Sequence, residues 1–161
     1  MKKEDREELY DLIDDVGTAM LVTDRAGELR SRPMKGQLDR DTGKIWFLTE
    51  TPSGKTNEID ADRSANLTYA CPEKETYISI TGRAQVEKSA SKIDDLWGPW
   101  AAAWLQCEKD HPKVATVCFT PDVAEYWCSP ESSIVQTWEL AKANLTGEKP
   151  ELGVNRTLNM D

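Results

Sequence analysis

The segment LTETPSGKTNEI, residues 48–59, contains residue types that could hold a phosphate group. Its Ser-Gly-Lys-Thr core matches the end of the P-loop pattern, but that pattern requires a glycine at the position of Thr49. A nucleoside triphosphatase is therefore excluded. Lys55, the hydroxyls of Ser53 and Thr56, and the backbone amides of a predicted helix start still offer donors to another kind of phosphate.

A second group of basic residues lies in RSRPMK, residues 30–35, on a predicted neighbouring strand. If the two strands are antiparallel neighbours, Arg32 would lie near Ser53 and Lys55. A guanidinium, an ammonium and hydroxyls would then surround one anion. The spacing alone leaves a second interpretation open, in which these residues form a solvated basic rim on an acidic protein.

The remaining reactive side chains form no catalytic set. His111 is the single histidine, and neither it nor Cys128 has an identifiable catalytic partner. The four cysteines contain no CxxC pair and predict reduced thiols rather than a zinc site: Cys71, Cys107, Cys118 and Cys128. Any demanding reaction would thus depend on a bound cofactor.

The chain contains six tryptophans but only two phenylalanines, an unusual ratio that calls for a structural or binding role of the indoles. Trp97, Trp100 and Trp104 recur at helical spacing, which predicts a stripe that faces the core or another subunit. Trp127 differs because it closes a strand in EYWCSP, where its indole could lie beside a flat heteroaromatic ring. Trp127 is therefore the aromatic candidate for a ligand site.

Length and charge limit the class of protein. The 161 residues predict one domain, and the formal charge of -9 argues against nucleic acid or an anionic membrane as a partner. The N-terminus lacks the apolar core of a signal peptide, and no segment approaches the roughly 18 apolar residues of a membrane span. We therefore expect a cytoplasmic protein with no nucleic-acid partner and no membrane partner.

The hydrophobic pattern predicts a mainly β protein with added helices. Alternating runs bounded by turn residues predict six strands, at residues 17–24, 29–38, 44–49, 64–72, 76–88 and 113–127, the last bent at Thr120-Pro121. Helical patterns occupy residues 3–14, 52–62 with Ser53 as N-cap, 89–106 with a break at Gly98-Pro99, and 131–147. These helices are too few for βαβ units, so we expect a six-stranded antiparallel β-barrel with peripheral helices. One domain would span residues 1–147, followed by an extended tail at 148–161.

Three blocks of the sequence together resemble one protein family: TAMLVTDRAGELRSRPM, IWFLTETPSGKTNEI, and the long segment from GRAQVEK to EYW. In order and spacing, over almost the whole chain, they are similar to the FMN-binding split barrels related to pyridoxamine 5'-phosphate oxidase. Within that family they resemble the bacterial general stress protein branch. The resemblance implies a split β-barrel that binds FMN as a homodimer, with two flavin sites shared between the subunits.

The resemblance also implies roles for individual residues. The FMN phosphate would be held by Arg32, Ser53 and Lys55. Further contacts with the flavin are implied for residues of the same strands and for one aromatic residue: Pro33, Met34, Leu48, Thr49 and Trp127.

The sequence departs from the oxidases where those enzymes hold a second phosphate. Gly54 and Gln37 stand at basic positions of the oxidases, and SPESSIVQTWEL lacks their basic and histidine motif. Oxidation of pyridoxamine phosphate is therefore not expected. The resemblance implies instead a flavin-dependent redox protein with another substrate.

Other functions remain open on the sequence. The chain could bind or buffer flavin as a non-catalytic dimer, take FAD in place of FMN, or bind the deazaflavin F420 as other split barrels do. Haem is disfavoured because His111 lies outside the predicted pocket, which leaves only a cysteine or tyrosine ligand.

Overall fold

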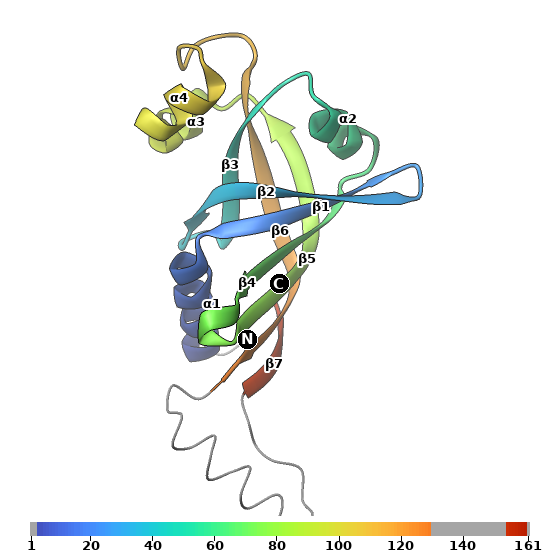
Figure 1. Cartoon of the computed structure of the whole chain (residues 1–161), viewed down its shortest axis with the longest axis vertical. Coiled ribbons are helices and arrows are strands. Elements are labelled where there is room, and N and C mark those ends of the chain that lie inside the picture. The colour runs from blue at the N-terminus through green and yellow to red at the C-terminus, as the bar shows by residue number, and fades with distance from the viewer. Residues whose placement is uncertain (1–2, 130–153, 161) are drawn as a thin grey trace, which may run out of the picture.

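The computed structural model describes residues 3–129 and 154–160 (Figure 1). The helices are α1 (Lys3–Val16), α2 (Gly54–Ala61), α3 (Ala90–Leu96), α4 (Pro99–Leu105) and the short 3-10 helix η1 (Pro72–Lys74). The strands are β1 (Thr18–Arg25), β2 (Glu28–Asp39), β3 (Lys44–Glu50), β4 (Ser64–Cys71), β5 (Thr76–Glu87), β6 (Val114–Cys128) and β7 (Val154–Asn159). Within this described part, no helix is long and apolar enough to cross a membrane. The predicted helix at 131–147 lies outside the described residues.

The strands form one antiparallel sheet in the order β3-β2-β1-β4-β5-β6-β7. Because β3 also pairs with β6, six of the strands close into a ring, and β7 is added along the other end of β6 (Figure 1). The mainly β, antiparallel architecture with peripheral helices is confirmed. Strand β7 lies within the predicted tail. Its sequence, VNRTLN, has only two aliphatic side chains, and it forms a strand by pairing with β6.

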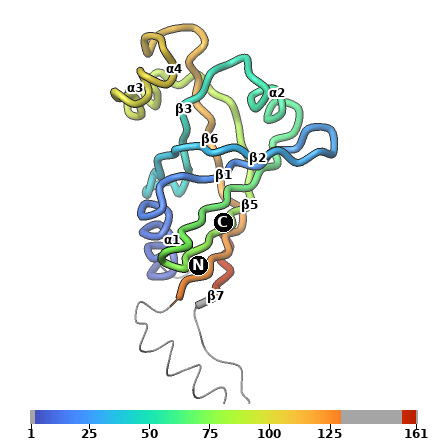
Figure 2. Tube along the Cα trace, in the orientation of Figure 1, coloured from blue at the N-terminus to red at the C-terminus, as the bar shows by residue number. Residues whose placement is uncertain are grey.

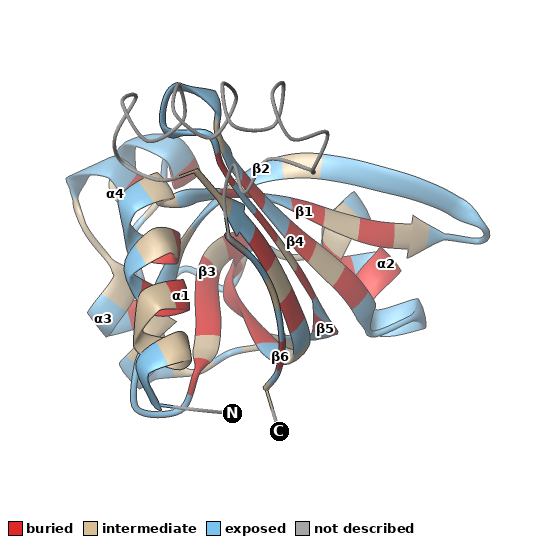
Figure 3. Ribbon diagram, turned by 90° about the horizontal axis from the view of Figure 1, so that it is seen from below, coloured by how far each residue is buried: buried red, intermediate tan, exposed pale blue. Residues whose placement is uncertain are grey.

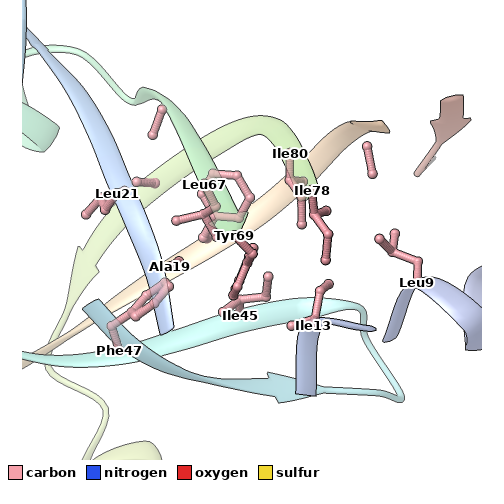
Figure 4. Packing of buried hydrophobic residues seen from close by; sticks show 14 of the residues in the cluster. Leu9, Ile13, Ala19, Leu21, Ile45, Phe47, Leu67, Tyr69, Ile78 and Ile80 are labelled. Carbon is pink, nitrogen blue, oxygen red and sulfur yellow. The ribbon is translucent and has the colours of Figure 1, made fainter. Parts of the chain in front are cut away.

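Alternate residues of the strands fill the interior of the ring, as the burial pattern shows in Figure 3 and the close view shows in Figure 4. The side chains that are almost fully buried there include Leu21, Ile45, Phe47, Leu67, Ile78 and Ile80. At one end of the ring α1 adds Leu9 and Ile13 to this core, and at the opposite end α2 adds Ile59. Burial of each such side chain stabilises the fold by about 1.5–3 kcal/mol.

Strand β6 bends where the sequence predicts a bend. Its pairing with β5 shifts between Thr81 and Gly82, and Asp122 is the extra residue on β6. A Cβ atom at Gly82 would lie 2.2 Å from the carbonyl oxygen of Thr120, so only glycine allows this close approach. The bend at Thr120-Pro121 is therefore confirmed.

The predicted helix at 89–106 is two short helices, since Pro99 cannot continue the hydrogen bonds of α3. Trp97 packs against the small core cluster beneath α3 and α4. Trp100 and Trp104 are 56% and 74% exposed, and their rings stack with centroids 5.8 Å apart. The core-facing interpretation is wrong for these two residues because the break changes the helical register. Contact with another subunit stays a prediction.

Candidate cofactor-binding site

Two of the three predicted phosphate residues, Ser53 and Lys55, lie at the start of α2, shortly after β3. Ser53 is the N-cap: its hydroxyl accepts a hydrogen bond from the Thr56 N–H at 3.4 Å, and its own N–H donates to the Thr56 hydroxyl at 2.8 Å. This capping box fixes the predicted start of the helix. The N–H groups of Gly54 and Lys55 precede the first intrahelical hydrogen bonds and remain available to an anion.

Lys55 is a half-buried cation that has no carboxylate partner among the described residues. Burial lowers the pKa of its ammonium below the ordinary 10.5, and the positive charge of Arg32 lowers that pKa further. Glu50 acts in the opposite direction, but its carboxylate is paired with Lys113 at 2.7 Å. Two cations that share a partly desolvated space repel each other unless an anion joins them. The surroundings of Lys55 therefore fit an anion.

Arg32 on β2 is held on two sides of its guanidinium. Its Nη1 donates to the hydroxyl of Thr23 on β1 at 2.6 Å, and its Nη2 donates to the carboxylate of Glu58 on α2, also at 2.6 Å. The Thr23 hydroxyl in turn donates to the same Glu58 oxygen at 2.6 Å. The three side chains, from three different elements, thus form a closed triangle of hydrogen bonds.

Glu58 is the buried carboxylate of this triangle, with a side chain only 5% exposed. Burial alone would raise the pKa of its carboxyl, but the hydrogen bonds from Thr23 and Arg32 and the charges of Arg32 and Arg30 hold that pKa below the ordinary 4.5. Glu58 is therefore ionised at neutral pH. The sequence analysis missed Glu58 and Thr23 as site residues. Two features of the sequence could have indicated them: Glu58 lies one helical turn after Lys55, and Thr23 is a hydroxyl residue among apolar strand residues.

The site carries an excess of positive charge although the whole chain has a formal charge of -9. Arg30 and Arg32 pair with one carboxylate, Glu58, and Lys55 has no carboxylate partner among the described residues, so these three cations and one anion leave a charge of +2. A phosphate monoester carries about -1.5 to -2 at neutral pH. The charge and the free N–H donors both fit such a group.

The predicted strand-end pair points to opposite sides of β3. Thr49 is buried on the inner side, where its hydroxyl donates to the Glu50 carbonyl at 3.4 Å. Leu48 packs on the outer side, against the cluster beneath α3 and α4. On β2, Met34 packs against the main core, while Pro33 is exposed beside Met20 of β1.

Trp127 lies apart from these residues. In the strand pairings Arg32 belongs to the row that continues through Leu21, Leu67, Ile80 and Ala124. Trp127 lies on β6 three residues beyond that row, outside the part of β6 that pairs with β3, and its side chain is 37% exposed on the outer face. A contact between Trp127 and a ligand at α2 would therefore require a second subunit.

Fold and site together define a small antiparallel β protein with a candidate anion site at one end of its strand ring. Residues 4–151 match the family described as pyridoxamine 5'-phosphate oxidase like, and the chain belongs to this family. A comparison with curated proteins finds no match.

Solved structures with the same fold include several general stress proteins. A candidate general stress protein 26 from Jannaschia sp. CCS1 is 27% identical, with a TM-score of 0.80 over 98% of this chain and 99% of that one. The general stress FMN/FAD binding protein of Xanthomonas citri is 26% identical, with a TM-score of 0.71 over 81% and 93% of the two chains. General stress protein 26 of Bacillus anthracis, at 21% identity and a TM-score of 0.69 over 75% and 92%, shares the fold. The resemblance to this family and its general stress branch is confirmed.

Proposed function

We propose that the chain binds FMN with the flavin phosphate at the first turn of α2, and that it acts as a flavin-dependent redox protein. The observation that carries the proposal is the half-buried ammonium of Lys55, which has no carboxylate partner among the described residues and whose pKa is lowered by burial and by the charge of Arg32. A phosphate would join these two cations and accept hydrogen bonds from the N–H groups of Gly54 and Lys55. The family, and the name of the FMN/FAD binding relative from Xanthomonas citri, support a flavin as the source of that phosphate.

The charge of the site favours FMN over FAD. The phosphate of FMN is a monoester with a charge of about -1.5 to -2, which balances the site. In FAD the same phosphate is part of a diphosphate and carries a single negative charge. We therefore expect FMN to bind more tightly, with FAD as the alternative flavin.

Bound FMN would supply hydride or electron transfer at its ring, and the chain would hold and orient it. Gly54 and Gln37 provide no charge for a second phosphate, so the proposed substrate is not pyridoxamine phosphate. We further propose a cytoplasmic location, where the four cysteines would stay reduced. A non-catalytic flavin-binding dimer and an F420-binding protein are the alternatives.

The proposal includes a homodimer, and the outer face of the sheet supports it. In the central part of this face, the single charged side chain among the described residues is Glu125. The other outward residues are Met20, Val22, Asn66, Thr68, Ala70, Tyr77, Ser79, Thr81, Val123, Trp127, Asn155 and Thr157. A large face with little charge and with exposed aromatic residues is typical of a subunit interface. It would also bring Trp127 to the neighbouring subunit.

Analytical ultracentrifugation tests the dimer. The wild-type protein should sediment as a dimer at micromolar concentration, and Val123→Glu should be a monomer because it would bury unpaired charge. Ser91→Glu, on the exposed surface of α3, is the control and should remain dimeric. A monomeric wild type would overturn this part of the proposal.

Titration with FMN, FAD and riboflavin, followed by flavin fluorescence, tests the cofactor. Riboflavin should bind about a hundredfold more weakly than FMN because it lacks the charge-assisted hydrogen bonds of the phosphate. Equal affinity for the two would contradict the phosphate site, and binding of none of them would direct the same titration to F420. Reduction of bound FMN by NADH or NADPH, with quinones as acceptors, separates the redox protein from the non-catalytic dimer.

A further inference from the structure

The triangle of Thr23, Arg32 and Glu58 contains two side chains that the phosphate site does not itself require. Glu58 is an ionised, buried carboxylate close to the proposed position of an anion, where its charge opposes phosphate binding. Thr23 is 1% exposed and carries no charge that could attract a phosphate. Both residues nevertheless make hydrogen bonds of 2.6 Å to the guanidinium that would bind the phosphate.

The geometry of these bonds restricts Arg32 strongly. The Thr23 hydroxyl accepts from Nη1 and uses its own hydrogen to donate to Glu58, so the direction of each bond in the triangle is set. A guanidinium is planar, and two hydrogen bonds to its two terminal nitrogens fix both its position and its plane. Its Nε–H and the second hydrogens of the terminal nitrogens are left for another acceptor.

We propose that Glu58 and Thr23 are positioning residues, which fix the Arg32 guanidinium so that its remaining hydrogens face the phosphate. The inference rests on the proposed FMN site at α2. A long arginine side chain that is already ordered loses less conformational freedom when it binds, and this gain offsets the unfavourable charge of Glu58. Arg32 should therefore contribute to phosphate binding only while the triangle is intact.

A double-mutant cycle distinguishes positioning from a simple cancellation of charge. The measured quantity is the ratio of FMN affinity to riboflavin affinity, in the wild type and in Arg32→Ala, Glu58→Gln and the double variant. Arg32→Ala should lower this ratio about thirtyfold in the wild type, but only about threefold when Glu58 is already glutamine. If Glu58 only cancelled charge, its removal would make Arg32 more effective, and Arg32→Ala would cost more in that background. A loss that is equal or larger there overturns the inference.

Thr23 offers a second test without any change of charge. Thr23→Val keeps the shape of the side chain and removes the hydroxyl, so the FMN to riboflavin ratio should fall about fivefold. Thr23→Ser keeps the hydroxyl and should stay within about twofold of the wild type. A purely structural role would weaken both ligands equally and leave the ratio unchanged.

The ratio of FMN affinity to riboflavin affinity in the wild type distinguishes a failure of the proposed phosphate site from a failure of the positioning role alone. A wild type that binds FMN and riboflavin equally overturns the proposed phosphate site itself. A wild type that prefers FMN, together with an unchanged ratio in Thr23→Val and no reduction of the Arg32 effect in Glu58→Gln, overturns only the positioning role. Thr23→Val and Thr23→Ser keep the test decisive if Glu58→Gln fails to fold.

Discussion

The two ends of the strand ring are both closed by a helix with charged side chains, but the charges are balanced differently (Figure 1). At the α1 end, ion pairs join three cations, Arg40, Lys74 and Arg156, to six carboxylates: Asp5, Glu7, Glu8, Asp11, Asp14 and Asp15. At the α2 end, Arg30 and Arg32 share one carboxylate, Glu58, and Lys55 has no carboxylate partner among the described residues. The α1 end is therefore rich in negative charge, and the α2 end has unpaired positive charge.

The difference distinguishes an end that stabilises the fold from the end where we propose that the ligand binds. Arg156 on β7 pairs with Glu8 on α1 at 3.0 Å, which ties the C-terminal strand to the N-terminal helix (Figure 2). Burial, reinforced by the hydrogen bond that the Tyr126 hydroxyl donates to Glu8, raises the pKa of Tyr126 to about 12. Every cation of that cluster already has its anion. At the α2 end, within the described part of the chain, Lys55 lacks one, which supports the proposed binding of an anion there.

The largest effect is expected from the core at the α1 end. Leu9→Ala should lower the free energy of unfolding by about 3 kcal/mol, because Leu9 is fully buried and its removal leaves a cavity. The FMN affinity of the folded protein should not change. Ile59→Ala is the matched variant, since Ile59 is equally buried at the α2 end and should weaken both stability and FMN binding. Urea unfolding measures the stability of the two variants, and FMN titration measures their affinity. An equal loss of FMN affinity in both variants would contradict the comparison.

Lys55→Ala should weaken FMN binding about a hundredfold and leave riboflavin binding unchanged, because it removes a charge-assisted contact to the phosphate. Its stability should not fall, since the lost ammonium is half-buried and has no carboxylate partner in the part of the chain that the structure describes. Lys109→Ala removes an exposed cation that pairs with Asp94, away from α2, and is the control. Equal losses for FMN and riboflavin would contradict the assignment.

The pH dependence of FMN affinity should have two limbs. The pKa of Lys55 is lowered in the free protein, so affinity should decrease as pH rises through that value, which lies below 10.5, and Lys55→Ala should lack this limb. On the acid side affinity should fall below about pH 6, where free FMN phosphate takes up a proton. Glu58 does not contribute between pH 5 and pH 8 because its pKa lies below 4.5. An alkaline limb that persists in Lys55→Ala would refute this explanation.

The smallest effect is expected from Arg40→Ala at the α1 end. Arg40 is 40% exposed and its ion pairs with Asp11 and Asp14 are screened by salt, so the thermal midpoint should fall slightly, and less at high salt. FMN affinity should stay the same. A clear loss of FMN binding would show that the α1 end is not purely structural.

The strand pattern of the ring was predictable because strands such as β4 and β5 alternate buried and exposed residues, and because β3 and β6 contain apolar runs bounded by turn residues. The capping box at Ser53 was also predictable, since the residue types of an N-cap are local in sequence. Strand β7 could not be predicted, because VNRTLN forms a strand only by pairing with β6. The exposure of Trp100 and Trp104 could not be predicted either, because the break at Pro99 alters the helical register.

The site could be predicted only in its parts. Residues 48–59 identify a helix start with phosphate donors, but the triangle of Thr23, Arg32 and Glu58 joins residues up to 35 positions apart. Such contacts depend on the register of β1 against β2 and on the packing of α2, which sequence periodicity does not determine. The role of Glu58 therefore becomes visible only in the structure.

Phosphorus NMR of FMN bound to the protein tests the phosphate site most directly. Free FMN changes its phosphorus chemical shift as the phosphate titrates near pH 6. If Lys55, Arg32 and the α2 amides hold the dianion, the bound signal should stay that of the dianion from pH 8 to well below pH 6. A bound phosphate that titrates like free FMN would lie in solvent and would contradict the account.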